Sequence, residues 1–141
     1  MNTPPKSGAD GIRANHSDVD EINHLTERII GCAIRAHKQL GAGLLESLYE
    51  NALSIEPTEA GLRFQRQAAI PVMYRGQVIG EHRLDLVVED AVVVELKSVE
   101  RMEPVFEAQV LTYLKISGKR IGLLINSNSR LLTQGIQRFI L

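Results

Sequence analysis

The sequence is short of cysteine, of long apolar runs and of aromatic residues. Cys32 is the only cysteine among 141 residues, which excludes an internal disulfide, and its place on the apolar side of a predicted helix indicates a buried free thiol. The strongly apolar stretches reach about ten residues, roughly half the length of a membrane-spanning helix. The N-terminus has no charged-then-apolar segment typical of a secretory signal, so we expect a soluble, cytoplasmic protein without a membrane partner.

Acidic residues are missing from the last part of the chain. No Asp or Glu follows Glu107, although five basic residues do: Lys115, Lys119, Arg120, Arg130 and Arg138. The formal net charge of -1 therefore divides into -6 on residues 1–107 and +5 on the remainder. This basic segment predicts contacts to a nucleic-acid backbone through Lys115, Lys119, Arg120 and Arg130. A set of solvated surface charges is the open alternative.

The first 18 residues differ in composition from the rest. They contain Pro4, Pro5, Gly8 and Gly11 and almost no large apolar side chain, so they cannot bury enough surface to offset chain entropy. We expect a disordered tail over residues 1–18. Because the chain is 44% hydrophobic and too short for two cores, we expect one compact domain over residues 19–141.

Three segments have the apolar periodicity of helices. The first runs over residues 18–40, with Gly41 as its stop, and the third begins at Pro104 and runs to residue 116. The second is predicted over residues 44–60, and Pro57 either kinks it or starts a new turn. Its apolar side consists of Leu45, Leu48, Ala52 and Ile55.

Between the second and third helices the apolar period drops to two. Residues 64–74, 78–88 and 92–99 are predicted as three consecutive antiparallel strands. The continuous apolar run over residues 121–125 is typical of a strand buried on both faces. Over residues 127–141 the sequence predicts a loop followed by a short strand or helix. The expected fold is therefore α/β (α+β), in the order ααβββαβ.

The turn between the second and third strands sets their register. We expect a three-residue loop over residues 89–91, so that Val88 pairs with Val92 and Asp85 lies opposite Glu95. Because side chains alternate between faces, one face is aliphatic and must be the core. That face carries Leu84, Leu86, Val88, Val92, Val94 and Leu96. The other face carries Arg83, Asp85, Val87, Val93, Glu95 and Lys97.

Two carboxylates opposed on paired strands repel each other unless a positive charge lies between them. A divalent cation that prefers oxygen suits Asp85 and Glu95, and Mg²⁺ or Mn²⁺ fits better than zinc because the sequence has no Cys or His cluster. Lys97 points to the same side and could orient a metal-bound water or stabilise a charged phosphate. The alternative is a surface ion-pair cluster in which Lys97 and Arg83 neutralise both acids.

Four separated motifs occur along the chain in a fixed order. Residues 43–49 read Gly-Leu-Leu-Glu-Ser-Leu-Tyr, and Asp85-Leu86, Glu95-Leu96-Lys97 and Gln109-x-x-x-Tyr113 follow. Together they resemble the motifs of the GxxExxY protein family, a branch of the PD-(D/E)XK nuclease superfamily. The resemblance extends over residues 20–140, and Pro57 is a departure from the family pattern that leaves the length of the second helix open.

The resemblance implies a restriction-endonuclease-like core, which is a central mixed β-sheet of four to five strands flanked by helices. It also implies that Asp85 and Glu95 are metal ligands, with the Leu96 backbone carbonyl as a third. Lys97 corresponds to the catalytic lysine. Glu46 corresponds to an acidic residue that many members of the superfamily present from a helix near the site. The resemblance implies a catalytic role for Glu46 and makes it a candidate for a further metal ligand.

Several of these residues have structural alternatives. Gln109 and Tyr113 lie four apart on one helix face and could position the substrate, or they could pack helix against sheet. Glu46 and Tyr49 could both face the metal, or they could be a solvated acid and a packing tyrosine. His82 falls on the strand face opposite the acids, which favours an isolated strand histidine over a ligand.

The leading hypothesis is a Mg²⁺- or Mn²⁺-dependent nuclease that hydrolyses phosphodiester bonds of DNA or RNA with a metal-activated water. The alternative is a weak or inactive module that binds nucleic acid or protein on the same fold. The near-zero net charge and the low aromatic content of 4% favour that alternative. A small-molecule phosphate hydrolase has no phosphate-binding glycine loop to support it. A homodimer also stays open, because small nucleases that cut both strands often pair.

Overall fold

The computed structural model describes residues 16–141, so most of the tail predicted over residues 1–18 lies outside the described residues. The first helix begins at His16, two residues ahead of its predicted start. The elements are α1 (His16–Leu40), α2 (Glu46–Glu59), β1 (Phe64–Tyr74), β2 (Gln77–Val88), β3 (Val92–Lys97), α3 (Pro104–Ser117), β4 (Ile121–Asn126), the short 3₁₀ helix η1 (Leu132–Gly135) and β5 (Ile136–Ile140). No helix within residues 16–141 is long and apolar enough to cross a membrane.

The five strands form one mixed sheet in the order β1-β2-β3-β4-β5. The three predicted strands are antiparallel neighbours, β3 and β4 are parallel, and β5 is antiparallel to β4. A parallel pair needs a crossover connection, and α3 supplies it between β3 and β4. The predicted mixed sheet flanked by helices is confirmed. The undecided C-terminal segment forms a short 3₁₀ helix and then a strand.

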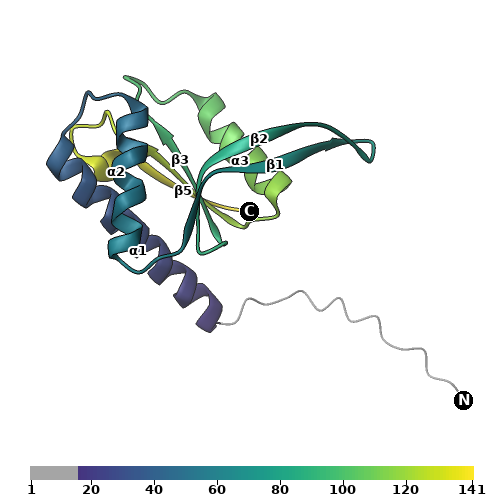
Figure 1. Ribbon diagram of the computed structural model, residues 1–141, viewed down its shortest axis with the longest axis horizontal. Helices are drawn as coiled ribbons and strands as arrows, with labels where there is room; N and C mark the ends of the chain where they lie inside the picture. The colour runs from purple at the N-terminus through teal and green to yellow at the C-terminus, as the bar shows by residue number, and fades with distance from the viewer. Residues whose placement is uncertain (1–15) are drawn as a thin grey trace, which may run out of the picture.

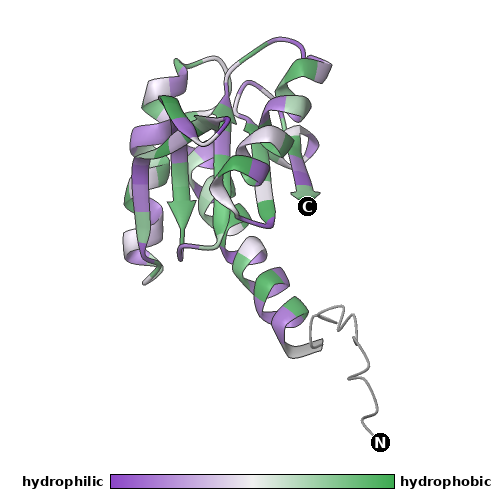
Figure 2. Cartoon of the chain, turned by 90° about the vertical axis from the view of Figure 1, so that its right-hand side faces the viewer, coloured by the Kyte–Doolittle hydropathy of each residue, from purple (hydrophilic) through white to green (hydrophobic). Residues whose placement is uncertain are grey.

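Helices cover both faces of this sheet (Figure 1). One core cluster joins α1 and α2 to one face, through buried residues that include Ile29, Leu53 and Leu123. A second cluster joins α3 to the other face, through Val110, Leu114 and neighbouring strand residues. Figure 2 shows hydrophobic residues concentrated along the central strands. The result is a three-layer arrangement, from which the β1–β2 hairpin extends beyond the rest of the sheet (Figure 1).

The apolar side of α2 is not the one predicted. Leu45, Leu48 and Ile55 are 72%, 45% and 63% exposed, whereas Tyr49, Leu53 and Pro57 are buried. These three buried residues are spaced by four, so they also form a helical face. Sequence alone could not decide between the two faces, because both carry apolar residues. The helix continues through Pro57 and ends two residues later at Glu59, so the proline does not break it.

Strands β3 and β4 are buried along almost their whole length. In β4 every residue is buried, as the apolar run predicted, and β3 is buried up to Leu96. Gly122 lies beneath α3, where a Cβ atom would come within 2.8 Å of Val110 Cγ1. The glycine therefore allows α3 to pack closely on the sheet. The buried thiol of Cys32, with 0% exposure, is confirmed in the opposite layer.

Leu84 does not lie on the face that strict alternation predicts. It packs in the α3 cluster with Val87 and Val93, whereas Leu86 packs in the α1 cluster. Two residues that are three apart on β2 therefore face the same side, and the alternation shifts by one position near Asp85. Val87 and Val93 are themselves buried, so both faces of the hairpin are core rather than one.

Candidate functional site

The backbone ladder between β2 and β3 stops immediately before the two predicted acids. It runs from the turn to the pair Leu86 and Val94, in the predicted register. Beyond that pair, side chains replace the backbone acceptors. The Asp85 N–H donates to Glu95 Oε1 at 3.2 Å, and the Leu96 N–H donates to Asp85 Oδ2 at 2.8 Å. The two carboxylates therefore lie across from each other where the strands separate.

Glu95 is a buried acid, with only 6% of the residue exposed. Burial raises the pKa of Glu95 to about 8, and the negative charge of Asp85 contributes to the rise. The hydrogen bond from the Asp85 N–H and the positive charge of Lys97 lower the pKa, but by less. An acid in this environment favours a proton or a cation beside it.

Lys97 ends β3 two residues after Glu95 and so points to the same face of the sheet. Its Nζ lies 4.7 Å from the centroid of the Phe106 ring in α3. Its carbonyl accepts hydrogen bonds from the Ser127 N–H at 2.8 Å and from Ser127 Oγ at 3.1 Å. Both ends of Lys97 thus have a contact: Ser127, directly after β4, binds its backbone carbonyl, and the Phe106 ring lies beside its ammonium group.

The two acids have no ion-pair partner within residues 16–141. No Lys or Arg nitrogen in this part of the chain lies within 4.0 Å of an oxygen of Asp85 or Glu95. Arg83 lies 3.5 Å from Glu81 instead, and both side chains are more than half exposed. The described residues thus do not form the ion-pair cluster that was the alternative to a metal site.

Glu46 lies in the first turn of α2, within electrostatic range of the acids. Glu46 is an exposed residue, but partial burial of its carboxyl group raises its pKa, the charges of Asp85 and Glu50 raise it further, and Lys97 lowers it. A carboxylate in the first turn also faces the positive end of the helix dipole. The negative charges of Asp85 and Glu50 thus both act on Glu46, near the point where the strands separate.

Tyr49, the last residue of the motif over residues 43–49, is 4% exposed and binds the loop that precedes α2. Its hydroxyl donates to the Gly41 carbonyl and accepts from the Leu44 N–H at 3.4 Å. The Leu44 carbonyl accepts from Ser98 Oγ at 2.9 Å, which ties the same loop to the chain just beyond β3. Tyr49 is thus a packing tyrosine that fixes the start of α2 against the end of β3.

Tyr113 of α3 lies near the acids. Burial raises the pKa of Tyr113, and the negative charges of Glu95 and Asp85 add to the rise. Its ring stacks on His82 with a centroid distance of 3.9 Å and an interplanar angle of 18°. His82 is thus not an isolated strand histidine, and its buried Nε2 has no hydrogen-bond partner among the described residues. Gln109 lies one turn earlier on α3 and is half-buried.

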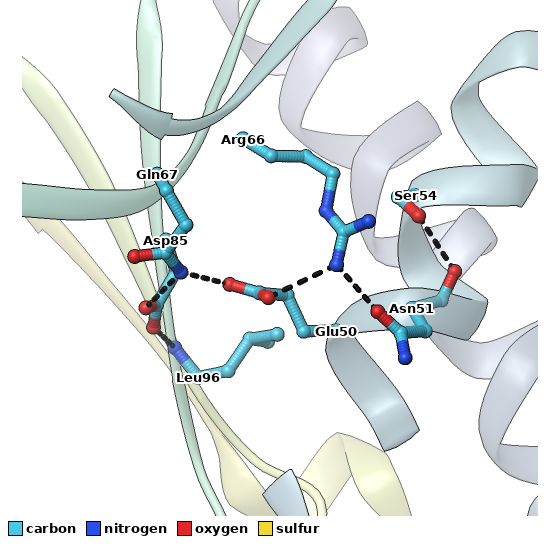
Figure 3. Close-up of polar contacts among 7 residues, drawn as sticks. All are labelled: Glu50, Asn51, Ser54, Arg66, Gln67, Asp85 and Leu96. Carbon is cyan, nitrogen blue, oxygen red and sulfur yellow. Dashed lines mark hydrogen bonds and ion pairs between the residues drawn. The ribbon is translucent and has the colours of Figure 1, made fainter. Parts of the chain in front are cut away.

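Three polar residues that sequence analysis did not single out form a chain of hydrogen bonds that leads to Asp85 (Figure 3). Gln67 of β1 donates from Nε2 to Asp85 Oδ1 at 3.4 Å and also to Glu50 Oε1. Arg66 donates from NH2 to Glu50 Oε2 at 3.1 Å and to Asn51 Oδ1 at 2.5 Å. Glu50 lies one helical turn after the acid predicted in α2, so the i, i+4 spacing was a signal for it. Gln67 and Arg66 had no comparable signal.

Two of the predicted nucleic-acid contacts lie at the other end of the sheet. Lys97 pairs with Asn126, the last residue of β4. Lys119 and Arg120 directly precede β4, so they are about 20 Å or more from that end at roughly 3.3 Å per residue. Lys119 Nζ binds Asp90 Oδ1 there at 2.8 Å. The fold therefore does not bring these two residues together with the acids.

The other two predicted contacts differ in position. Lys115 is in the last turn of α3, close in sequence to the distal end of β4. Arg130 follows β4, is exposed, and lines a surface hollow together with Lys38 and Gly41. Of the four basic residues, Arg130 is thus the one at the same end of the sheet as Lys97.

The donor set at this position suits a small divalent cation in part. Asp85 and Glu95 offer carboxylate oxygens, and Mg²⁺ commonly binds through one or two carboxylates plus water and substrate phosphate. Within residues 16–141, no group of three or more His, Cys, Asp and Glu side chains is arranged to hold a metal ion. Glu46 therefore does not complete a three-acid site in this conformation. The buried, unpaired Glu95 is the observation that favours a cation.

Comparison with known protein families finds a match over most of the chain. The family model described as the PD-(D/E)XK nuclease superfamily matches residues 23–139. No curated protein and no solved structure matches the chain. The family match spans most of the 141 residues and includes all four motifs and both acids. The chain belongs to the PD-(D/E)XK nuclease superfamily.

Proposed function

We propose that this protein is a metal-dependent nuclease that hydrolyses phosphodiester bonds of DNA or RNA, with Asp85, Glu95 and Lys97 at its centre. The observation that carries the proposal is the buried Glu95 beside Asp85, with no protein cation paired to either among residues 16–141. Membership of a nuclease superfamily supports the same chemistry. The proposed substrate is a nucleic acid, and the proposed cofactor is Mg²⁺ or Mn²⁺.

Each residue has a separate part in this proposal. Asp85 and Glu95 hold the cation through their carboxylates, with the Leu96 carbonyl as a further ligand and Glu46 as a nearby acid. A bound cation supplies an activated water and neutralises charge on the phosphate. Lys97 places its ammonium group beside the phosphate, where it stabilises the charge that develops during hydrolysis. In the structure this ammonium group lies over the Phe106 ring, 4.7 Å from its centroid.

We also propose that the chain belongs to the GxxExxY branch of the superfamily. Within this proposal, Tyr49 supports the site indirectly, because it holds the loop that leads to Glu46. Gln109 and Tyr113 are proposed to position the substrate from α3. The raised pKa of Tyr113, caused by burial and then by the nearby acids, keeps its hydroxyl protonated and able to donate to a phosphate oxygen.

A cleavage assay with Lys97→Ala tests the nuclease proposal. Single- and double-stranded DNA and RNA are incubated with the wild type or the variant in Mg²⁺ or Mn²⁺. We expect Lys97→Ala to lose activity by about 100-fold or more, as when a charge-stabilising donor is removed. The matched control is Lys119→Ala, a lysine that binds Asp90 at the distal end of the sheet, which should cleave like the wild type. Equal activity of wild type and Lys97→Ala would remove Lys97 from the mechanism.

The alternative is a binding module on the same fold. It is favoured by one observation, that no three-acid metal cluster occurs within residues 16–141. Titration calorimetry with Mn²⁺ separates the two functions. Binding in the wild type that is lost in Glu95→Gln supports the nuclease, whereas heat of binding that is equal in both proteins, or absent from both, supports the module.

A further inference from the structure

Gln67 has an unusual backbone conformation for a strand residue. Four non-glycine residues of the described chain have positive φ, and three of them, Arg75, Glu89 and Asp90, lie in hairpin turns where this conformation is common. Gln67 has a φ of 49° inside β1. Backbone conformations of this kind in non-glycine residues persist where the surroundings enforce them, and they concentrate at functional sites.

The position of this residue in the sheet is specific. In the β1–β2 ladder, Arg66 pairs with Leu86 and Ala68 pairs with Leu84, so Gln67 falls opposite Asp85. The unusual backbone of β1 thus lies beside the point where β2 leaves β3 and where the alternation of β2 shifts. The positive φ of Gln67 and the end of the β2–β3 ladder therefore both lie next to Asp85.

The side chain of Gln67 connects Asp85 to α2 (Figure 3). Its Nε2 carries two hydrogens and has two acceptors, Glu50 Oε1 and Asp85 Oδ1, the latter at 3.4 Å. Glu50 is held in turn by Arg66 at 3.1 Å. The second oxygen of Asp85 accepts from the Leu96 N–H at 2.8 Å. Each Asp85 oxygen therefore has its own donor, and these two bonds set the rotation of the carboxylate.

We propose that Gln67 is a positioning residue that orients Asp85 for metal binding, and that the Arg66–Glu50 ion pair holds the Gln67 amide in place. The inference rests on the proposed function, in which Asp85 is a ligand. Partners that orient a metal ligand typically contribute 10- to 100-fold in metal affinity or activity. Gln67 is exposed and belongs to neither core cluster, so its side chain is not needed for packing.

The test uses Gln67→Gly, because glycine adopts positive φ freely while it removes the amide. We expect this variant to melt at or above the wild-type temperature, since it removes an unfavourable backbone conformation. We expect its Mn²⁺ affinity, measured by titration calorimetry, to fall by about 10-fold or more. The matched control is Arg75→Gly, which replaces another residue of positive φ (51°) far along the hairpin and should bind Mn²⁺ like the wild type.

Two further variants separate positioning from a general structural effect. Gln67→Asn keeps an amide and tolerates positive φ, but it is one methylene shorter and should also bind Mn²⁺ less tightly. Glu50→Ala removes the anchor of the amide, so it should weaken binding in the wild type but add little in Gln67→Gly. Full additivity of the two changes would show that Glu50 does not act through Gln67.

The outcomes distinguish this inference from the function on which it rests. A wild-type protein that does not bind Mn²⁺ overturns the proposed function and the inference with it. Wild-type binding that is unchanged in both Gln67→Gly and Gln67→Asn overturns the inference alone. Weaker binding in both variants, with the melting temperature retained and Arg75→Gly unaffected, establishes Gln67 as a positioning residue.

Discussion

Replacing Glu95 with glutamine should change how the stability of the metal-free protein depends on pH. The folded pKa of Glu95 is raised by burial and by Asp85 to about 8, whereas the unfolded value is close to the ordinary 4.5. Below pH 4.5 both states hold the proton, and above pH 8 neither does. Between these values the unfolded state loses the proton first, so the free energy of unfolding falls as the pH rises.

The size of the effect follows from the pKa difference. A rise from 4.5 to about 8 corresponds to about 5 kcal/mol at 1.36 kcal/mol per pKa unit, and about 4 kcal/mol of this falls between pH 5 and pH 9. A glutamine at position 95 cannot ionise, yet its carbonyl oxygen can still accept from the Asp85 N–H and its amide can donate to the Asp85 carboxylate. Glu95→Gln should therefore be more stable than the wild type, increasingly so at alkaline pH.

Urea unfolding in the presence of a chelator measures this difference. Unfolding of wild type and Glu95→Gln is followed by circular dichroism at steps from pH 5 to pH 9. Because every other titrating group is shared, the difference between the two proteins reports on Glu95 and its coupling to Asp85. We expect it to grow by about 4 kcal/mol over this range. A difference that stays constant, or one that shrinks as the pH rises, would refute the pKa assignment and the burial on which it rests.

Three other substitutions test separate parts of the structure. Tyr49→Phe removes the hydroxyl that binds the loop before α2 and should lower the free energy of unfolding by about 1 kcal/mol in urea titrations. Gly122→Ala places a Cβ atom 2.8 Å from Val110 Cγ1 and should destabilise by about 1–3 kcal/mol, and Val110→Ala in the same chain should recover part of that loss. Arg130→Ala should reduce the slope of nucleic-acid affinity against salt concentration by about 1 in logarithmic units, whereas Lys119→Ala should leave it unchanged because Asp90 pairs with Lys119 at the distal end.

The sequence predicted those parts of the fold that depend on local signals. Gly41 and Gly118, both with positive φ, end α1 and α3 as expected, and Pro104 begins α3. The hairpin register also followed from local information, because the length of the turn and the alternating aliphatic residues leave one pairing that buries them. That register alone predicts from the sequence that Asp85 lies opposite Glu95.

The parts that were wrong or missed depend on contacts between distant segments. The buried side of α2 is set by where the helix lies on α1 and the sheet, and its own sequence offers two apolar faces. The shift of alternation at Leu84 occurs where β2 separates from β3, which no strand pattern encodes. Gln67 was missed for a related reason, since glutamine has no preference for positive φ and its partners lie 17 and 18 residues away.

The separation of β2 from β3 has a practical consequence for inactive variants. At this point the strands are joined by carboxylate oxygens that accept main-chain amides, so Asp85 and Glu95 are structural acceptors as well as acids. Alanine at either position would leave an amide without its acceptor and would disturb the hairpin, so a loss of cleavage could not be assigned to chemistry. Asparagine and glutamine are the suitable replacements, because they retain the acceptor and remove only the charge.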